Sequence, residues 1–235
     1  MLNIGVIGCG AIGRDHIRRL TDIVPGCQVV ACADYFEESA NKVAAQYEGM
    51  KAYKTGEELI HAPEVQAVVI TSSDPSHAGY VLEALKAGKY VFCEKPLSLS
   101  AEQSRELADL AKEKGVVNYC GFSNIMNPAN QYVAELVKSG KLGKIMRVHA
   151  TYDQDMLLDP SIPIAWRHIN KLAGSGALGD LCSHLLSVSQ MIMGDMSEVL
   201  GVQSIVIPER PVKAGSTEMG KVENDDLITF LVKYE

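Results

Sequence analysis

The sequence predicts an α/β domain with a doubly wound parallel sheet, followed by an α+β domain with an open antiparallel sheet. Short apolar runs alternate with helical periodicity over residues 1–120, which is typical of a parallel sheet with crossover helices. A glycine-rich loop joins the first apolar run to the first helix. Over residues 121–235 the pattern changes to longer polar stretches and strands of alternating polarity, which favours a second domain.

Five near-continuous apolar runs in the first half are typical of strands buried on both faces of a sheet. They cover residues 2–7, 28–33, 65–70, 90–93 and 116–119. Helical periodicity lies between them, at residues 11–23, 37–47, 76–87 and 100–114. Ser100 and Gln103 have the spacing of a capping box, which predicts the start of the last of these helices.

The second half predicts fewer and more widely spaced elements. We expect helices at residues 128–139 and 177–193, strands at residues 145–154, 199–207 and 227–232, and a long loop at residues 208–220. The chain ends directly after the last strand, so we expect a C-terminally truncated domain with an unfinished sheet. An unfinished sheet has a free edge, which predicts self-association.

Composition limits the function classes. The chain has 235 residues, 47% of them hydrophobic, and a net charge of −7 with no basic half, which disfavours a nucleic-acid partner. It contains neither a membrane-length apolar run nor an export signal, so we expect no membrane association. Six cysteines without a Cys-x-x-Cys pair predict reduced thiols and a cytoplasmic protein.

The loop Gly8-Cys-Gly10-Ala11-Ile12-Gly13 follows the first predicted strand and opens the first predicted helix. In this position the first glycine allows a tight turn, the second lets a pyrophosphate approach the backbone, and the third packs the helix on the strand. The helix N-terminus offers unpaired N–H groups to the anion. The alternative is a tight turn without a ligand.

Asp34 ends the second apolar run, 21 residues after Gly13, where a dinucleotide-binding domain reads the adenosine ribose. A carboxylate there accepts hydrogen bonds from the ribose hydroxyls and repels a 2′-phosphate. The residues that follow, Tyr-Phe-Glu-Glu, offer no cation for that phosphate, so NAD is favoured over NADP. The alternative is that Asp34 is a solvated loop residue.

Two further strand ends carry polar side chains to the same edge of the sheet. Thr71, Ser72 and His77 follow one strand and are candidates for lining the cofactor cleft, or for capping the next helix. Glu94 and Lys95 follow another strand, where a fixed cation could hold a substrate hydroxyl and favour its alkoxide.

Asp180 and His184 lie four residues apart in a helical pattern, which places both on one face. Three interpretations stay open from spacing alone: a carboxylate that orients an imidazole proton acceptor, two metal ligands, or a surface pair. A metal would need a third ligand, which no motif supplies, so we expect no metal.

Taken together, these motifs resemble the Gfo/Idh/MocA family of NAD(P)-dependent oxidoreductases, which includes inositol and glucose–fructose enzymes. The resemblance rests on the glycine loop and His16, Asp34, Glu94-Lys95-Pro96, Leu142-Gly-Lys144-Ile145, Trp166-Arg167, and the run Gly176 to Asp180 and His184. It implies a Rossmann domain, then an α+β domain whose sheet is often the oligomer interface. It also implies that Lys95, Asp180 and His184 surround the reacting carbinol.

Asn124, Tyr152, Trp166 and Arg167 are further candidates for substrate contacts under this resemblance. The chain departs from the family pattern at Ser123-Asn124, where an Arg pair is common, and at Ser187, where an Asp is common. Both changes remove possible sugar contacts.

The sequence therefore predicts an NAD-dependent dehydrogenase that acts on a secondary alcohol of a polyol, sugar or inositol, working as a homo-oligomer. Two alternatives stay open. One is an oxidoreductase with a non-sugar substrate such as a dihydrodiol. The other is a non-catalytic NAD-binding regulatory protein.

Overall fold

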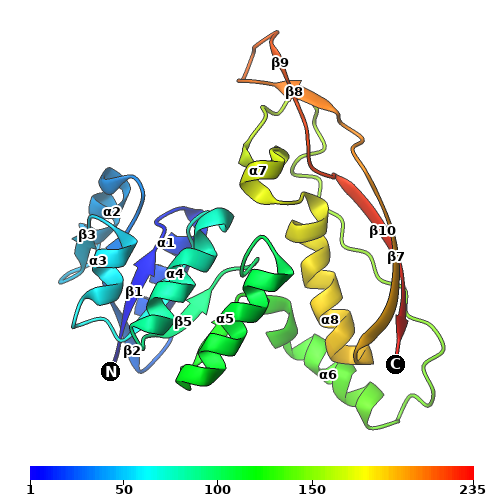
Figure 1. The fold of residues 1–235 in the computed structure, drawn as a ribbon, viewed down its shortest axis with the longest axis horizontal. Helices are drawn as coiled ribbons and strands as arrows, with labels where there is room; N and C mark the ends of the chain where they lie inside the picture. Colours follow the sequence, from blue (N-terminus) through cyan, green and yellow to red (C-terminus); the bar gives the residue numbers. More distant parts are fainter. The chain divides into compact units, whose positions relative to one another are not determined.

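The computed structural model describes all of residues 1–235 and divides them into two compact units, Met1–Gly121 and Phe122–Glu235 (Figure 1). The first unit is built on a six-stranded parallel sheet of order β3-β2-β1-β4-β5-β6. Its strands are β1 (Leu2–Ile7), β2 (Cys27–Ala33), β3 (Lys51–Tyr53), β4 (Ala67–Ile70), β5 (Tyr90–Cys93) and β6 (Asn118–Cys120). This is the strand order of a Rossmann sheet, with its topological switch point between β1 and β4.

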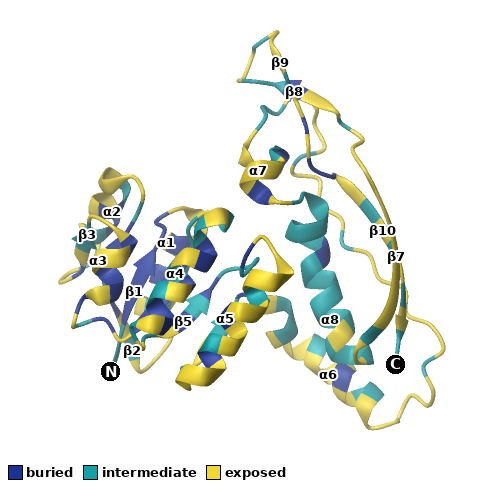
Figure 2. Ribbon diagram, in the orientation of Figure 1, coloured by how far each residue is buried: buried dark blue, intermediate teal, exposed yellow.

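Helices cover both faces of this sheet because successive strand residues point to opposite sides. Ile4 and Val6 of β1 join the cluster under α1 (Ala11–Asp22) and α2 (Glu37–Ala44), whereas Ile7 joins the cluster under the other helices. Those are α3 (Gly56–His61), α4 (Asp74–Lys86) and α5 (Ala101–Lys114). Figure 2 shows buried residues on β1 and on parts of the helices around it, and the residues of β4 are buried as well. The predicted doubly wound domain is confirmed.

The first unit follows the predicted pattern closely, with two additions. The short strand β3 and the helix α3 lie in a stretch that has no clear period in the sequence. The helix α5 begins as its capping signal predicts, because the Ser100 side chain accepts a hydrogen bond from the Gln103 N–H at 3.2 Å. It ends at Gly115, whose φ of 63° is the left-handed conformation that glycine adopts most readily.

The second unit combines helices with two separate antiparallel pairs. Strands β7 (Met196–Ser204) and β10 (Leu227–Tyr234) form a long ribbon, and β8 (Glu209–Pro211) pairs with β9 (Met219–Lys221). The helices are α6 (Pro128–Lys138), α7 (Asn170–Ala173) and α8 (Ser183–Met193), with a π-helical turn at Leu178–Cys182 directly before α8. Short 3-10 turns lie at Ser123–Met126 and Trp166–His168. The α+β class predicted for this half is confirmed.

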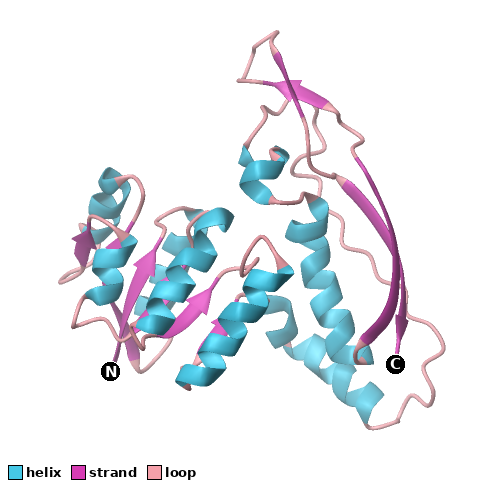
Figure 3. Cartoon of the chain, viewed as in Figure 1, coloured by secondary structure: helices cyan, strands magenta, loops and turns pink.

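Two predictions for the second unit are wrong. Residues 145–154 do not form a strand, and Figure 3 draws the connection between α6 and α7 as loop apart from the short turn before α7. A strand needs a neighbour to complete its hydrogen-bond ladder, and this segment pairs with none of the strands present. Residues 208–220 are not a plain loop, because they contain most of the β8–β9 hairpin.

No helix of the structure combines the length and the apolar character needed to cross a membrane. All six cysteines are free thiols, and three of them are buried in the first unit: Cys9, Cys32 and Cys93.

Candidate functional site

The glycine loop lies at the carboxyl end of β1. Gly8 has a φ of 99°, and a Cβ there would lie 2.6 Å from the backbone nitrogen of Ser72. A Cβ at Gly13 would collide with the carbonyl oxygen of Gly8. By contrast, a Cβ at Gly10 would meet no atom within 4 Å, so the middle of the loop faces open space. Gly8 and Gly13 are thus required for close packing within the protein, and Gly10 has open space beside it.

The open space at Gly10 lies at the N-terminus of α1. Gly10 is the residue before the first turn of the helix, and no side chain caps that turn. Ala11 and Ile12, the first helical residues, are exposed. The N–H groups of a first turn have no partner within the helix, and they carry the positive end of its dipole. This arrangement can bind a phosphate group.

Asp34 lies beside this loop at the end of β2. Its two carboxylate oxygens accept hydrogen bonds from the backbone N–H groups of Cys9 at 2.6 Å and Phe36 at 2.9 Å. Asp34 is only half-buried, and each carboxylate oxygen has a second lone pair. The carboxylate therefore fixes the glycine loop and can still accept hydrogen bonds from ribose hydroxyls.

The Cys9 thiol lies under the same loop and stays protonated. A hydrogen bond with Cys32 and burial both raise the pKa of Cys9, and the negative charge of Asp34 acts in the same direction. A thiol in this state is a poor nucleophile. Cys9 therefore serves packing within the loop.

Thr71 and Ser72 form the turn after β4, next to the glycine loop. The Thr71 hydroxyl lies 3.1 Å from the carbonyl oxygen of Ile7 and 2.8 Å from that of Gly8, and it can donate to either. The Ser72 hydroxyl lies 2.6 Å from that of Ser76, in the first turn of α4. Thr71 thus anchors the glycine loop, and Ser72 anchors the start of the next helix.

Glu94 and Lys95 follow β5 at the same edge, and the bond between Lys95 and Pro96 is cis. A ring nitrogen of His16, on α1, lies 2.9 Å from the Glu94 carboxylate. Burial by itself raises the pKa of Glu94, but the hydrogen bond with His16 and the charges of His16 and Lys95 outweigh it and lower the pKa overall. Glu94 is therefore a carboxylate at neutral pH, and Lys95 is half-buried beside it.

His77 lies on α4 below these turns and is 1% exposed. Its ring nitrogens contact the backbone carbonyls of Ser72 and Pro96. The ring thus joins the turn after β4 to the loop after β5, and a direct contact with a cofactor stays a prediction.

In the second unit, Asp180 lies in the π-helical turn and His184 in the first turn of α8. Asp225 lies two residues before β10. Its side chain accepts hydrogen bonds from the N–H groups of Gly176 at 2.9 Å and Leu178 at 2.7 Å. These are N–H groups at the beginning of the helix, which have no helical partner. π-turns are frequent at functional sites. Asp225 therefore fixes the segment that carries both candidate residues.

The His184 ring lies between two aromatic rings. Its centroid is 6.0 Å from that of Phe122 and 6.2 Å from that of Tyr152, and both contacts are edge-to-face. Such contacts orient an imidazole without occupying either nitrogen. The structure thus brings Tyr152, a predicted substrate contact, next to the predicted proton acceptor.

Asp180 is joined to Arg167, and through it to Trp166, which are two more of the predicted contacts. The Nε of Arg167 donates to the Asp180 carboxylate at 3.3 Å, and the Arg167 guanidinium lies 4.3 Å from the centroid of the Trp166 ring. Asn124 lies in the 3-10 turn directly before α6, and its carbonyl accepts a hydrogen bond from the Asn130 side chain. A substrate contact of Asn124 stays a prediction.

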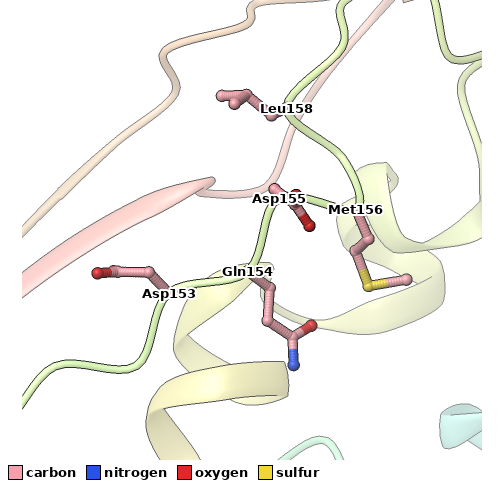
Figure 4. Close-up of a pocket in the computed structure, with 5 residues that line it drawn as sticks. All are labelled: Asp153, Gln154, Asp155, Met156 and Leu158. Atoms are coloured by element: carbon pink, nitrogen blue, oxygen red, sulfur yellow. The ribbon is translucent and has the colours of Figure 1, made fainter.

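A pocket of about 590 Å³ is lined by residues that follow Tyr152 in the sequence: Asp153, Gln154, Asp155, Met156 and Leu158 (Figure 4). In Figure 4 the side chains of Asp153 and Gln154 point in different directions from the loop. Burial raises the pKa of the Cys182 thiol, and the charges of Asp225 and Asp153 add to this. The pocket therefore offers polar atoms close to the helical segment that carries Asp180.

Sequence reasoning missed two residues that shape these sites, Arg14 and Asp225. Arg14 donates to the Cys9 carbonyl at 3.0 Å and brings a cation to the glycine loop. Asp225 acts through backbone N–H groups far away in the sequence, which no local pattern reveals. Glu94 was a predicted residue, but its contact with His16 was not predicted. The structure contains no group of three or more His, Cys, Asp or Glu side chains that could hold a metal ion.

Comparisons with known proteins cover both units. Residues 2–122 match the profile described as oxidoreductase family, NAD-binding Rossmann fold, and residues 130–235 match the GFO/IDH/MocA C-terminal domain. The levoglucosan dehydrogenase of Pseudarthrobacter phenanthrenivorans is 30% identical over 99% of this chain and 64% of its own length. The inositol 2-dehydrogenase of Serratia proteamaculans is 34% identical over 91% of this chain and 60% of its own length.

Solved structures agree with these matches. The crystal structure of an NAD binding oxidoreductase from Klebsiella pneumoniae has a TM-score of 0.91 and 37% identity, covering 100% of this chain and 64% of that one. Levoglucosan dehydrogenase in complex with NADH and L-sorbose has a TM-score of 0.89 and 30% identity, covering 99% of this chain and 63% of that one. The chain thus spans less than two thirds of the length of these relatives. Because the matched profiles cover nearly all of its residues, the chain belongs to the GFO/IDH/MocA oxidoreductase family.

Proposed function

We propose that the chain is an NAD-dependent dehydrogenase that oxidises a secondary alcohol of a polyol, sugar or inositol. The observation that carries this proposal is that one chain combines an open dinucleotide loop with an anchored helical segment bearing Asp180 and His184. A protein that only senses NAD needs the loop alone. The names of relatives, inositol 2-dehydrogenase and levoglucosan dehydrogenase, support a polyhydroxylated substrate.

The residues of the first unit fit NAD. The space at Gly10 and the uncapped first turn of α1 suit the pyrophosphate, and Asp34 suits a ribose with free hydroxyls. Bound NAD would supply the hydride acceptor. Thr71 and Ser72 would keep the turn after β4 in place at this edge, through their contacts with Gly8 and Ser76.

For the chemical step we propose one role for each of three side chains. His184 accepts the proton of the substrate hydroxyl while the carbinol carbon loses a hydride, which leaves a carbonyl group. Asp180 stabilises the imidazolium that forms, and Lys95 holds the substrate oxygen and favours its alkoxide. Arg167 keeps the Asp180 carboxylate in place through its hydrogen bond.

A non-sugar substrate such as a dihydrodiol is the second candidate, because of Ser187. The family often has an Asp here, whereas the Ser187 hydroxyl donates to the His184 carbonyl at 2.8 Å. A hydroxyl engaged with its own helix is less able to bind a sugar. This observation favours a substrate with fewer hydroxyl groups than an inositol has.

The experiment is a substrate panel followed by the absorbance of reduced nicotinamide. Inositols, levoglucosan, hexoses, linear polyols and cyclic dihydrodiols are each tested with NAD and with NADP. We expect turnover of at least one polyhydroxylated substrate, with NAD preferred. Turnover of dihydrodiols alone would favour the second candidate. Tight NAD binding without turnover of any substrate would favour the regulatory alternative and contradict the proposal.

We further propose that the protein is cytoplasmic and self-associates. Six free thiols and no disulfide support a reducing compartment. The β7–β10 ribbon exposes several large apolar side chains: Val199, Leu200, Val202, Leu227 and Leu231. Exposed apolar surface of this kind is typical of an interface, and a second copy of this chain offers the same surface.

A further inference from the structure

His77 makes an unusual pair of contacts within the first unit. Its Nδ1 lies 2.7 Å from the carbonyl oxygen of Pro96, and its Nε2 lies 3.0 Å from the carbonyl oxygen of Ser72. The residue is 1% exposed, so water does not compete for either nitrogen. Both ring nitrogens of a buried histidine therefore face backbone acceptors.

This arrangement fixes the number of protons on the ring. A carbonyl oxygen accepts hydrogen bonds and cannot donate them, so each contact needs an N–H on the histidine. A neutral imidazole has one N–H, and it would direct its other nitrogen lone pair at a carbonyl oxygen. An imidazolium has two N–H groups and satisfies both carbonyls. Two charge-assisted hydrogen bonds also compensate for burying the charge.

The two carbonyls belong to the two turns that carry the candidate cofactor and substrate contacts. The Ser72 turn is locked to the glycine loop, because the Thr71 hydroxyl contacts the Gly8 carbonyl at 2.8 Å. Pro96 directly follows Lys95. The His77 ring thus connects the turn at Ser72, which holds the glycine loop, to the segment that carries Lys95.

Lys95 is held from its other side as well. Glu94 precedes it, and the carboxylate of Glu94 lies 2.9 Å from Nε2 of His16. One neighbour of Lys95 is thus tied through its side chain to α1, and the other through its carbonyl to α4. With both neighbours fixed, the backbone of Lys95 has little freedom to shift.

We propose that His77 is a doubly protonated positioning residue, which sets Lys95 by holding the Pro96 carbonyl against the turn at Ser72. The importance of this bridge for turnover rests on the proposed role of Lys95 in the dehydrogenase reaction. The charge on the ring does not depend on that role, and it can be measured separately.

Four other ionisable groups lie on the segments that His77 connects. Asp74 begins the same helix, Glu94 and Lys95 lie on the loop after β5, and Cys93 ends that strand. Burial raises the pKa of the Cys93 thiol, so it contributes no charge. Glu94 is a carboxylate, and Asp74 lies close enough for its charge to act on Cys93. The charged residues named on these segments are thus two carboxylates, Asp74 and Glu94, and one cation, Lys95.

The first measurement is ¹⁵N NMR of the histidine ring nitrogens in the full chain. The His77 signals are assigned by their loss in His77→Asn. We expect both ring nitrogens of His77 to carry protons, because each of them faces a carbonyl oxygen. A ring nitrogen of His77 with a free lone pair at neutral pH would overturn the proposal, whether or not any alcohol is oxidised.

The second measurement separates the two contacts with a pair of amide substitutions. The amide nitrogen of Asn can take the place of Nδ1 and donate to Pro96, whereas that of Gln can take the place of Nε2 and donate to Ser72. We expect His77→Gln to lower kcat by up to about 10²-fold, because Lys95 shifts. His77→Asn should keep most of the turnover, and both variants should keep NAD affinity within about twofold of each other.

Equal losses of kcat in the Asn and Gln variants would show that His77 only fills space, and would overturn the positioning role. His61→Gln is the control, because His61 is exposed and contacts only Glu83 among charged side chains. It should change neither kcat nor NAD affinity. If no substrate of the panel is oxidised, the proposed dehydrogenase function fails, and the NMR result alone then decides whether His77 is a charged bridge.

Discussion

The Asp34 carboxylate binds two backbone N–H groups at a place where it could also contact a ligand. Asp34 accepts hydrogen bonds from the N–H groups of Cys9 and Phe36, so it stabilises the glycine loop before any nucleotide binds. The stabilisation of the loop by Asp34 could not be predicted from the sequence, although the position of Asp34 after β2 could. A substitution at this position must therefore separate loop stability from ribose recognition.

Asp34→Asn is suited to that separation, because the amide oxygen can still accept from the Cys9 N–H. We expect NAD to bind more weakly by about 1.5–3 kcal/mol, through loss of the charge-assisted hydrogen bonds to the ribose. NADP should lose less, because the repulsion of its 2′-phosphate disappears as well. Titration of both nucleotides measures this, with a melting curve as the check on folding. Equal weakening of the two nucleotides would contradict the ribose assignment.

Glu94 makes the free energy of unfolding depend on pH in the acid range. Its pKa is lowered in the folded protein, since the His16 contact and nearby charges outweigh the effect of burial. A lowered pKa means that the ionised group stabilises the fold above the carboxyl's ordinary pKa, and that this stabilisation is lost as the pH falls through the folded value. We expect the difference in unfolding free energy between the wild type and Glu94→Gln to shrink on acidification.

Urea unfolding at a series of pH values, from neutral to the acid range of carboxyl groups, measures this difference. Glu83→Gln is a matched control, because Glu83 also contacts a histidine but its side chain is more exposed than that of Glu94. A difference for Glu94→Gln that stays constant with pH would mean that the folded protein does not favour the ionised form.

At the scale of elements, the helical segment that carries Asp180 and His184 depends on a residue distant in sequence. Asp225 supplies the hydrogen bonds that its first turn lacks, and a Cβ at Gly176 would collide with the Asp225 carbonyl. A local pattern cannot reveal such a cap, because the acceptor lies in the segment before β10. The sequence did predict the helix itself from its apolar period.

Asp225→Ala should destabilise the fold by about 1 kcal/mol, the usual effect of losing a helix cap, and should also lower turnover. Asp226→Ala is the matched control, because the Asp226 carboxylate accepts from the N–H groups of Val206 and Ile207 instead. It should lower stability to a similar degree and leave turnover unchanged. Melting curves and kcat of both variants test this, and equal turnover in the two would contradict a role for Asp225 in positioning the segment.

Most elements of the first unit, though not β3 and α3, were predictable because the strands are buried by helices that are near them in the sequence. The second unit was less predictable, because its strands depend on distant partners. β7 pairs with β10 across the β8–β9 hairpin, whereas residues 145–154 have a strand-like pattern and no partner. Periodicity reports which side of a segment is apolar, and it does not report whether a neighbour is present.

At the scale of the whole molecule, the β7–β10 ribbon predicts association. Leu200 and Leu231 face each other across the ribbon and are 65% and 70% exposed. We expect a self-associated protein in sedimentation at micromolar concentration, and dissociation in the double variant Leu200→Glu/Leu231→Glu. Exposed residues on α5, such as Glu102, offer control sites whose substitution should leave the assembly unchanged. A strictly monomeric wild type would contradict this expectation.

The proposed chemistry is tested most directly by the turnover of His184→Gln, measured beside NAD binding on a substrate that the panel identifies. The nucleotide is assigned to the first unit, whereas His184 lies in the second, so NAD affinity should be unchanged. Loss of the proton acceptor should lower kcat by about 10²- to 10⁴-fold. Wild-type turnover in His184→Gln, with the same NAD affinity, would contradict the assignment of His184 as the proton acceptor.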